Sequence, residues 1–287
     1  MHPASSSDHR DDWDQHWTDY NDSAELNPAQ EWRRDVVLDL LNLRPTDRLI
    51  DIGSGQGDLA RDVLLAHPQV AVEGLELSRS GVEHATSKVV GANFHQINLL
   101  THSPEIPDLK GWANKVVCSE VLEHLDDPGT LLVNALQYAA PGARVVITVP
   151  AGPRTAFDKH IGHRKHYNRS SLRTLMESAG LHVDRVDAAG FPFFNLYRLI
   201  VFLRGEKLIA DVAGETSAVS SGPTRLLLRA FHILFPLNLR QGGLGWQMIA
   251  VGTLKVTPAL QSETPARVST MVGGQPITRQ RSQDQVR

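Results

Sequence analysis

The feature that most constrains the fold is an alternation of short aliphatic runs with segments of helical periodicity. The runs are rich in Val, Ile and Leu, and helical patterns of about 10 to 15 residues separate them. Such an alternation is typical of parallel β-strands joined by crossover helices. It predicts a three-layer α/β domain with a seven-stranded, mostly parallel sheet. The expected strands cover 47–52, 70–77, 92–97, 115–121, 143–150, 181–190 and 245–256.

Shifts in composition divide the chain into three parts. Residues 1–12 are rich in Ser, Asp and His, and residues 258–287 are rich in Gln, Ser, Thr and Arg, so both are expected to be disordered. Residues 13–257 form the predicted folded domain. Within it we expect N-terminal helices over 13–45 and a helical insertion over 190–245, before the last strand.

Charge and cysteine content exclude several classes of protein. The formal net charge of −3 lacks the basic excess of a nucleic-acid-binding protein, so no nucleic-acid partner is expected. The single cysteine, Cys118, rules out an intramolecular disulfide and suits a reducing compartment. No run approaches the roughly 18 to 20 apolar residues of a membrane-spanning helix, and the first residues carry no apolar signal segment. These observations favour a cytoplasmic location.

The stretch LIDIGSGQGD, residues 49–58, joins the first predicted strand to a helix. Its glycines, Gly53, Gly55 and Gly57, can adopt positive φ and let a ligand approach the backbone closely. In parallel α/β sheets, ligands bind at the carboxyl ends of strands near the point where strand order reverses. The loop therefore predicts a ligand site, with a glycine-rich turn that binds nothing as the alternative.

Two carboxylates narrow the kind of ligand. Glu76 ends the second predicted strand roughly 20 residues after the glycines, where a carboxylate can accept both hydroxyls of a ribose. This spacing also suits NAD. However, the loop reads D-x-G-x-G-x-G rather than G-x-G-x-x-G, and Asp51 is a poor neighbour for a pyrophosphate but a good one for a cation. No Gly-Lys-Ser/Thr follows, which excludes a P-loop.

Three motifs carry a resemblance to a known family. DIGSGQG is similar to motif I of class I S-adenosylmethionine-dependent methyltransferases, and LEL resembles their acidic-loop motif. KVVCSEVLEHLDDP closely resembles the fourth-strand motif of ubiquinone-biosynthesis-type (methyltransferase 11/12-like) small-molecule O-methyltransferases. The resemblance covers roughly residues 13–190 and the last strand. It implies a Rossmann-like class I methyltransferase fold that binds S-adenosylmethionine and releases S-adenosylhomocysteine.

The resemblance also implies which residues bind the cofactor. Asp51 should lie near the methionyl ammonium, and Glu76 with Leu77 at the ribose. After the third strand the family often has an Asp that contacts the adenine amine. Asn98 stands at this position here, and Leu99 follows it. An N-terminal lid helix should bring Arg33 to the cofactor carboxylate. The alternatives are that Arg34 makes this contact, or that the segment is only an amphipathic surface helix. The other contacts implied are Tyr20, Gly53, Ser54, Gly55, Gly57, Ser119 and Glu120.

His124, in SEVLEHL, is the first candidate catalytic residue. It follows the fourth strand on the side expected to face the transferred methyl group, and a neutral imidazole suits removal of an acceptor proton. The alternative is that His124 only packs or caps the loop. Glu120, Glu123 and His124 could also hold a hard divalent cation. A metal is not the favoured interpretation, so no metal ligand is assigned.

A second candidate segment, residues 158–167, carries histidines at intervals of three between the fifth strand and the next helix. The corresponding connection closes over the acceptor in this fold, so His163 and His166 are predicted to bind the acceptor or transfer protons. Merely solvated histidines and a structural metal are the alternatives, although no cysteine accompanies them. The cationic run HRKH could meet an anionic acceptor group.

The insertion over 190–245 combines apolar segments with scattered Arg and Lys. It could pack on the domain edge, form a homodimer interface, line an apolar acceptor pocket, or make peripheral contact with a membrane. Neither apolar segment is long enough to span a bilayer. In the acceptor-site interpretation, the contact residues are Phe191, Phe193, Phe194 and Tyr197.

Together these features predict methyl transfer from S-adenosylmethionine to a small acceptor that is partly apolar or anionic, with O-methylation in a biosynthetic pathway favoured. C- or N-methylation of an isoprenoid or lipid-linked acceptor is the alternative within enzymes. A non-catalytic module that binds S-adenosylmethionine is an alternative of another class, although Asp51, Glu76 and His124 argue against it. A dinucleotide oxidoreductase comes third.

Overall fold

The structure is a computed structural model that describes residue 13 and residues 27–101, 106–213 and 222–256. Tyr20 and the ends predicted to be disordered, 1–12 and 258–287, lie outside the described residues. In the part of the chain that is described, no helix is both long and apolar enough to cross a membrane.

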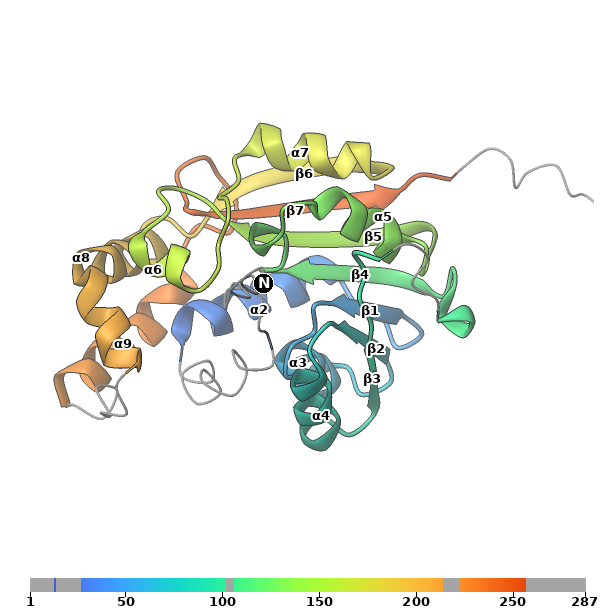
Figure 1. Ribbon diagram of the computed structural model, residues 1–287, viewed down its shortest axis with the longest axis horizontal. Coiled ribbons are helices and arrows are strands. Elements are labelled where there is room, and N and C mark those ends of the chain that lie inside the picture. Colours follow the sequence, from blue (N-terminus) through green and yellow to red (C-terminus); the bar gives the residue numbers. More distant parts are fainter. Residues whose placement is uncertain (1–12, 14–26, 102–105, 214–221, 257–287) are drawn as a thin grey trace, which may run out of the picture. The chain divides into compact units, whose positions relative to one another are not determined.

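Seven strands form one sheet in the order β3-β2-β1-β4-β5-β7-β6 (Figure 1). The pairs among β1 to β5 are parallel, whereas β7 runs antiparallel to both of its neighbours, β5 and β6. This confirms the predicted seven-stranded, mostly parallel sheet. The strands are β1 (Arg48–Ile52), β2 (Ala71–Glu76), β3 (Ala92–Gln96), β4 (Ala113–Ser119), β5 (Ala139–Pro150), β6 (Leu181–Ala189) and β7 (Gln247–Leu254).

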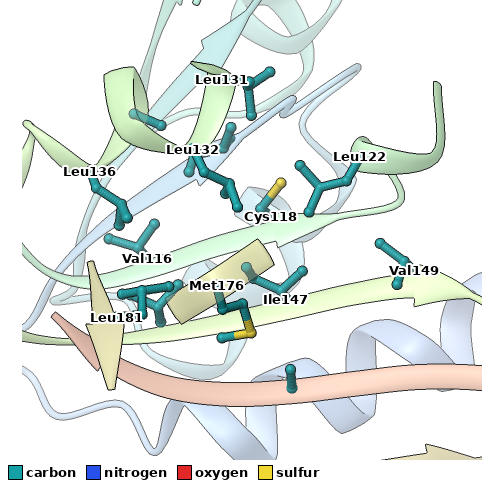
Figure 2. Packing of buried hydrophobic residues seen from close by; sticks show 14 of the residues in the cluster. Val116, Cys118, Leu122, Leu131, Leu132, Leu136, Ile147, Val149, Met176 and Leu181 are labelled. Carbon is teal, nitrogen blue, oxygen red and sulfur yellow. The ribbon is translucent and has the colours of Figure 1, made fainter. Parts of the chain in front are cut away.

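Helices cover both faces of the sheet. Side chains of α5 (Pro128–Leu136) and α7 (Arg169–Ser178) pack on one face of the sheet, in a cluster with Val116 of β4 and Ile147 of β5 (Figure 2). Side chains of α2 (Pro28–Leu41) and α3 (Asp58–Ala66) pack on the other face against Leu49. Because successive strand residues point to opposite faces, a buried strand must be apolar on both sides. This explains the continuous aliphatic runs of the sequence.

Polar side chains fix where several helices begin. Asn27, Ser78 and Asp127 each accept a hydrogen bond from a backbone N–H in the first turn of α2, α4 (Arg79–Lys88) and α5. A capping box between Thr155 and Asp158 starts α6 (Ala156–His160), a helix not predicted from the sequence. Its five residues are too few for an apolar periodicity to appear. Short 3₁₀ turns cover η2 (Pro107–Leu109), η3 (Leu122–His124) and η5 (Phe235–Leu237).

The insertion forms two helices, α8 (Phe193–Ala213) and α9 (Gly222–Leu234), as predicted. Phe194 is 2% exposed and packs with Phe235 against Trp32 of α2. The ring of Tyr197 meets that of Phe231 with centroids 5.3 Å apart. Phe194 and Tyr197, candidate acceptor contacts in the sequence, therefore hold the insertion onto α2. Phe191, in contrast, is 38% exposed.

Candidate functional site

The glycine loop lies at the carboxyl end of β1, next to the end of β4. Gly53, Gly55 and Gly57 have φ of +68°, +52° and +78°, a region that L side chains rarely adopt. A Cβ on Gly53 would lie 2.4 Å from Cγ2 of Val121, which follows β4. The loop therefore needs glycine both for its backbone conformation and for its close approach to the end of β4.

Glu76 lies beneath this loop at the end of β2. Its side chain is buried, with Oε2 accepting a hydrogen bond from the Gly55 N–H at 2.8 Å and Oε1 accepting one from the Ser78 N–H at 2.9 Å. The structure thus brings together Glu76 and the loop, as the spacing predicted. Ser54 Oγ, also buried here, has no hydrogen-bond partner within the described segments.

Asp51, one strand away, is buried near two other carboxylates. Burial, followed by the negative charges of Glu76 and Asp58, raises the pKa of Asp51 to about 7. A cationic group placed beside it would offset this effect. The location is consistent with the predicted contact to a methionyl ammonium.

The residues after β3 are more exposed than Asp51 and Glu76, apart from Leu99. Asn98 is exposed, and its side-chain Oδ1 accepts a hydrogen bond from the Leu100 N–H at 2.9 Å. A carbonyl oxygen has a second lone pair, so Asn98 can still accept from an amine. Leu99 is buried and Leu77 is 43% exposed.

A polar network joins α2 to the end of β4. Arg33 Nη2 lies 3.1 Å from Glu120 Oε2. Glu120 Oε1 accepts hydrogen bonds from Gln247 Nε2 at 2.8 Å and from Thr148 Oγ1 at 3.1 Å. Glu120 has φ of +58°, a strained conformation for a non-glycine residue, and this network holds it there. Ser119 Oγ lies 2.8 Å from Thr148 Oγ1.

The two neighbouring arginines of α2 point to different places. Arg34 Nε lies 2.6 Å from Asp62 Oδ2 on α3, so it is engaged away from the end of β4. Arg33 is therefore the arginine that α2 brings to the site. The role predicted for it, contact with a cofactor carboxylate, stays a prediction.

Glu123 is the most unusual group of the site. Its side chain is fully buried, and neither carboxylate oxygen has a hydrogen-bond partner within the described segments. Its Oε1 lies 3.9 Å from His124 Nε2 and 4.0 Å from His163 Nε2. Burial, and then the charge of Glu120, raises the pKa of Glu123 well above its usual range. A buried carboxylate without hydrogen bonds is costly unless another group satisfies it.

Asp158, His163 and His166 adjoin this carboxylate. Asp158 Oδ1 lies 3.8 Å from His163 Nδ1, and Asp158 Oδ2 lies 3.8 Å from His166 Nε2. Burial, together with the nearby His124 and His166, lowers the pKa of His163 to about 2. Burial also lowers the pKa of His166. Both rings are therefore neutral at pH 7, as metal ligands must be.

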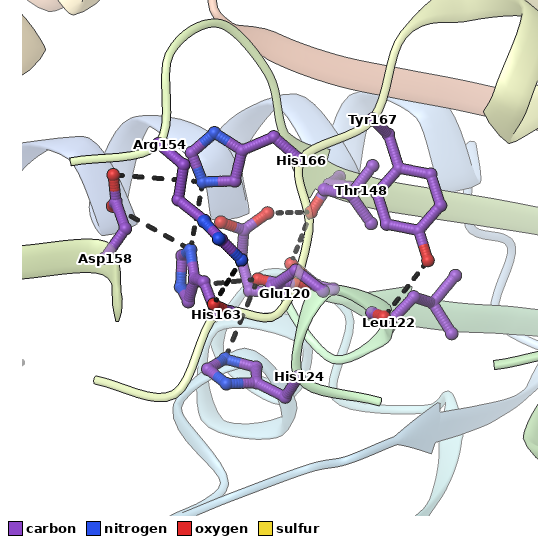
Figure 3. Close-up of polar contacts among 12 residues, drawn as sticks. Glu120, Leu122, His124, Thr148, Arg154, Asp158, His163, His166 and Tyr167 are labelled. Atoms are coloured by element: carbon purple, nitrogen blue, oxygen red, sulfur yellow. Dashed lines mark hydrogen bonds and ion pairs between the residues drawn. The ribbon is translucent and has the colours of Figure 1, made fainter. Parts of the chain in front are cut away.

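Three contacts hold the histidine segment in place. The Arg164 N–H donates to the Glu123 carbonyl at 2.7 Å, and the Tyr167 hydroxyl donates to the Leu122 carbonyl at 3.1 Å (Figure 3). On the other side, Arg198 Nη2 of α8 lies 3.0 Å from Asp158 Oδ2. The insertion is thus joined to the histidine segment by a buried ion pair.

Two groups of side chains in the described part of the chain could hold a metal ion. Glu123, His124 and His163 form one, and Asp158, His163 and His166 form the other; within each, the ligand atoms lie within 4.8 Å of one another. The sequence raised Glu120, Glu123 and His124 as a possible cation site without favouring it; the structure groups Glu123 and His124 with His163 instead of Glu120.

Other residues of the site were missed at the sequence level. Asp158 and Arg198 were not singled out because their pairing joins elements far apart in the chain. Trp13 was taken only as a domain boundary, yet its ring lies 4.8 Å from that of His124, centroid to centroid. No spacing rule would have found these contacts.

Comparison with known proteins identifies the family. Residues 26–186 match the family described as "Methyltransferase domain". A ubiquinone biosynthesis O-methyltransferase of Aeromonas salmonicida is 27% identical over 196 residues, 61% of this chain and 79% of that protein. A ubiquinone/menaquinone biosynthesis C-methyltransferase of Geotalea daltonii is 26% identical over 137 residues, 47% of this chain and 58% of that protein.

Solved structures agree on the fold. Haemonchus contortus phosphoethanolamine N-methyltransferase 2 in complex with S-adenosyl-L-methionine superposes with a TM-score of 0.52 at 16% identity, covering 77% of this chain and 52% of that one. The strand order, the glycine loop and the family match agree with one another. The chain belongs to the methyltransferase domain family and is an S-adenosylmethionine-dependent methyltransferase.

Proposed function

We propose that this methyltransferase transfers its methyl group to an oxygen atom of a small, partly apolar acceptor, such as a hydroxyl group on an aromatic ring. The observation that carries the proposal is the buried, unsatisfied carboxylate of Glu123 beside His124 and His163. An oxygen acceptor must lose a proton, and an imidazole nitrogen beside this carboxylate is the group we propose to take it. The Aeromonas relative, named as an O-methyltransferase of ubiquinone biosynthesis, supports the same class of acceptor.

The cofactor would occupy the glycine loop in this proposal. Asp51 would face its cationic amino group and Glu76 its ribose hydroxyls, because both carboxylates are buried at adjacent strand ends. To bind the ribose hydroxyls, Glu76 would either give up its hydrogen bond from the Gly55 N–H or accept from this N–H and the hydroxyls together. Methyl transfer is an in-line displacement, so these residues act mainly by positioning the donor.

Glu123, His124 and His163 also fit a divalent cation. Their ligand atoms lie within 4.8 Å of one another, and a cation would satisfy the carboxylate that lacks hydrogen bonds. A bound cation would act as a Lewis acid that lowers the pKa of an acceptor hydroxyl. The chain's own part is to keep the imidazole of His163 neutral and to hold the carboxylate near both rings, out of water.

Exposed apolar side chains on the insertion favour an acceptor that has an apolar portion. Leu199, Phe202 and Leu203 of α8 and Leu226 and Ile233 of α9 are 40% to 75% exposed. Side chains of this kind favour contact with an apolar molecule, or with a surface that carries one. Arg198 ties α8 to the histidine segment, which connects this surface to the site.

The test is methyl transfer from radiolabelled S-adenosylmethionine to catechols that carry alkyl chains of increasing length. We expect O-methylated product, favoured by the longer chains, and loss of activity on chelation with recovery on addition of Mg²⁺, Mn²⁺ or Zn²⁺. Glu123→Gln should lower kcat by about 100-fold or more, because it removes the anionic ligand of the proposed cation. Glu177→Gln, on the exposed face of α7, is the matched control.

The position of the new methyl group decides between candidate functions. Product analysis by mass spectrometry and NMR distinguishes a methoxy group from a methyl group on carbon. A carbon-methylated product would support C-methylation, the activity in the name of the Geotalea relative. Full activity of Glu123→Gln would reject the site proposed here.

A further inference from the structure

His163 and His166 are joined by one short contact between ring nitrogens. Nδ1 of His163 lies 3.2 Å from Nε2 of His166 (Figure 3). Nδ1 of His166 lies 3.0 Å from the carbonyl oxygen of Gly152. Both distances are within hydrogen-bond range, so each contact requires one proton between its two atoms. The chemistry of the three groups decides which nitrogen carries each proton.

A carbonyl oxygen can only accept, so Nδ1 of His166 must carry the proton of its contact with Gly152. A neutral imidazole has a single N–H, which leaves Nε2 of His166 as an acceptor. The proton between the two rings therefore belongs to Nδ1 of His163. Nε2 of His163 then has a lone pair, and it lies 4.0 Å from Oε1 of Glu123.

We propose that Gly152 and His166 are positioning residues that fix His163 as its Nδ1–H tautomer and present its Nε2 lone pair to the acceptor end of the site. The proposal deepens the proposed function, on which it rests for the role of His163. His166 then acts through His163, in contrast to the catalytic role that the sequence predicted for it.

Gly152, whose carbonyl fixes the order of protons, is itself held in place by its surroundings. Asp158 does not distinguish the two nitrogens that share the proton, because it lies 3.8 Å from Nδ1 of His163 and 3.8 Å from Nε2 of His166. Gly152 has φ of +72°, and a Cβ there would lie 2.8 Å from Cγ of Trp246. Any other residue at position 152 would require the Trp246 indole to shift if the carbonyl at this position is to stay where it is.

The direct test reads the tautomer from histidine ¹⁵N chemical shifts in the metal-free protein near pH 7. We expect Nδ1 of both His163 and His166 to be protonated and Nε2 of both to be unprotonated. His166→Leu removes the acceptor, and His163 should then shift to the Nε2–H tautomer or to a mixture. His166→Gln is the conservative variant, because its amide can donate to Gly152 and accept from His163, so it should retain the wild-type tautomer of His163.

Metal binding supplies a second readout. Zn²⁺ titrated into His166→Leu should bind about tenfold or more weakly than into wild type, and His166→Gln should restore most of the affinity. An Nε2–H tautomer of His163 in the wild type, two protonated nitrogens on His166, or an unchanged His163 in His166→Leu would each overturn the proposal. If the tautomers are as expected but no divalent cation binds to the wild type, the cation site fails and the tautomer assignment stands.

Discussion

Arg33 and Glu120 form a largely buried ion pair, with Arg33 Nη2 3.1 Å from Glu120 Oε2. The pair joins the first described helix of the domain to the strand end that follows Cys118. Glu120 also adds to the negative charge around Glu123. An arginine that the family resemblance assigned to the cofactor thus has a carboxylate of the protein as its partner.

Replacing this arginine should lower catalytic efficiency. Arg33→Met leaves Glu120 unpaired beside Glu123, and we expect kcat/KM for the cofactor to fall about tenfold or more, since a hydrogen bond to a charged group contributes about 1.5 to 3 kcal/mol. Arg34→Met is the matched control, because Arg34 pairs with Asp62 instead. Steady-state kinetics check the prediction, and equal losses in both variants would contradict it.

Cofactor affinity should depend on pH through Asp51. Its pKa is about 7 in the unbound protein, and a cationic ligand binds only the ionised carboxylate well. Below pH 7 the ligand must displace a proton, so affinity should fall by up to about tenfold per pH unit, whereas above pH 7 it should level off. Isothermal titration with S-adenosylhomocysteine, which also carries the amino group, measures this. Asp51→Asn should bind weakly at every pH, without the slope.

Two glycines with similar φ separate strain from steric overlap. Gly53 (φ +68°) faces Val121 at 2.4 Å from an added Cβ, whereas Gly111 (φ +65°) has open space around it. Gly111→Ala should lower the free energy of unfolding by about 1 kcal/mol through backbone strain alone. Gly53→Ala should cost more and should also weaken cofactor binding. Urea denaturation and titration provide the measurements, and equal effects would show that Val121 moves away freely.

Breaking the Arg198–Asp158 pair should destabilise the protein much more than breaking an exposed pair. Removing one partner of a buried ion pair costs about 3 kcal/mol or more, because the other charge is left buried. Arg198→Met and Asp158→Asn should each destabilise the protein by about this amount, and the double variant by less than their sum. The exposed pair Arg173–Glu177 on α7 is the control, with about 0.5 kcal/mol expected. Additive losses would contradict the coupling.

The sequence predicted those features that depend on local pattern. Strand and helix order followed from periodicity, and the proximity of the glycine loop to Glu76 followed from the parallel β-α-β arrangement. Contacts between distant elements could not be read in this way. Arg33 and Arg34 are equivalent in the sequence, and only the packing of α2 distinguishes them.

The insertion shows a different limit of the sequence. The sequence left open whether the aromatic side chains of the insertion pack on the domain or contact an acceptor, because α8 is apolar around most of its circumference and periodicity could not indicate which face is buried. Packing against Trp32 placed Phe194 in the core. The positive φ of Glu120 was also hidden, because nothing in the local sequence favours that conformation at a glutamate.

The position of β7 has a consequence for the order of assembly during synthesis. It is the last strand along the chain, yet it lies between β5 and β6, so β6 has no place in the sheet until β7 has left the ribosome. Gln247, which opens β7, also holds Glu120 at the end of β4. A nascent chain can therefore form the glycine loop early, but the end of the site around Glu120 is completed only when the final strand enters the sheet.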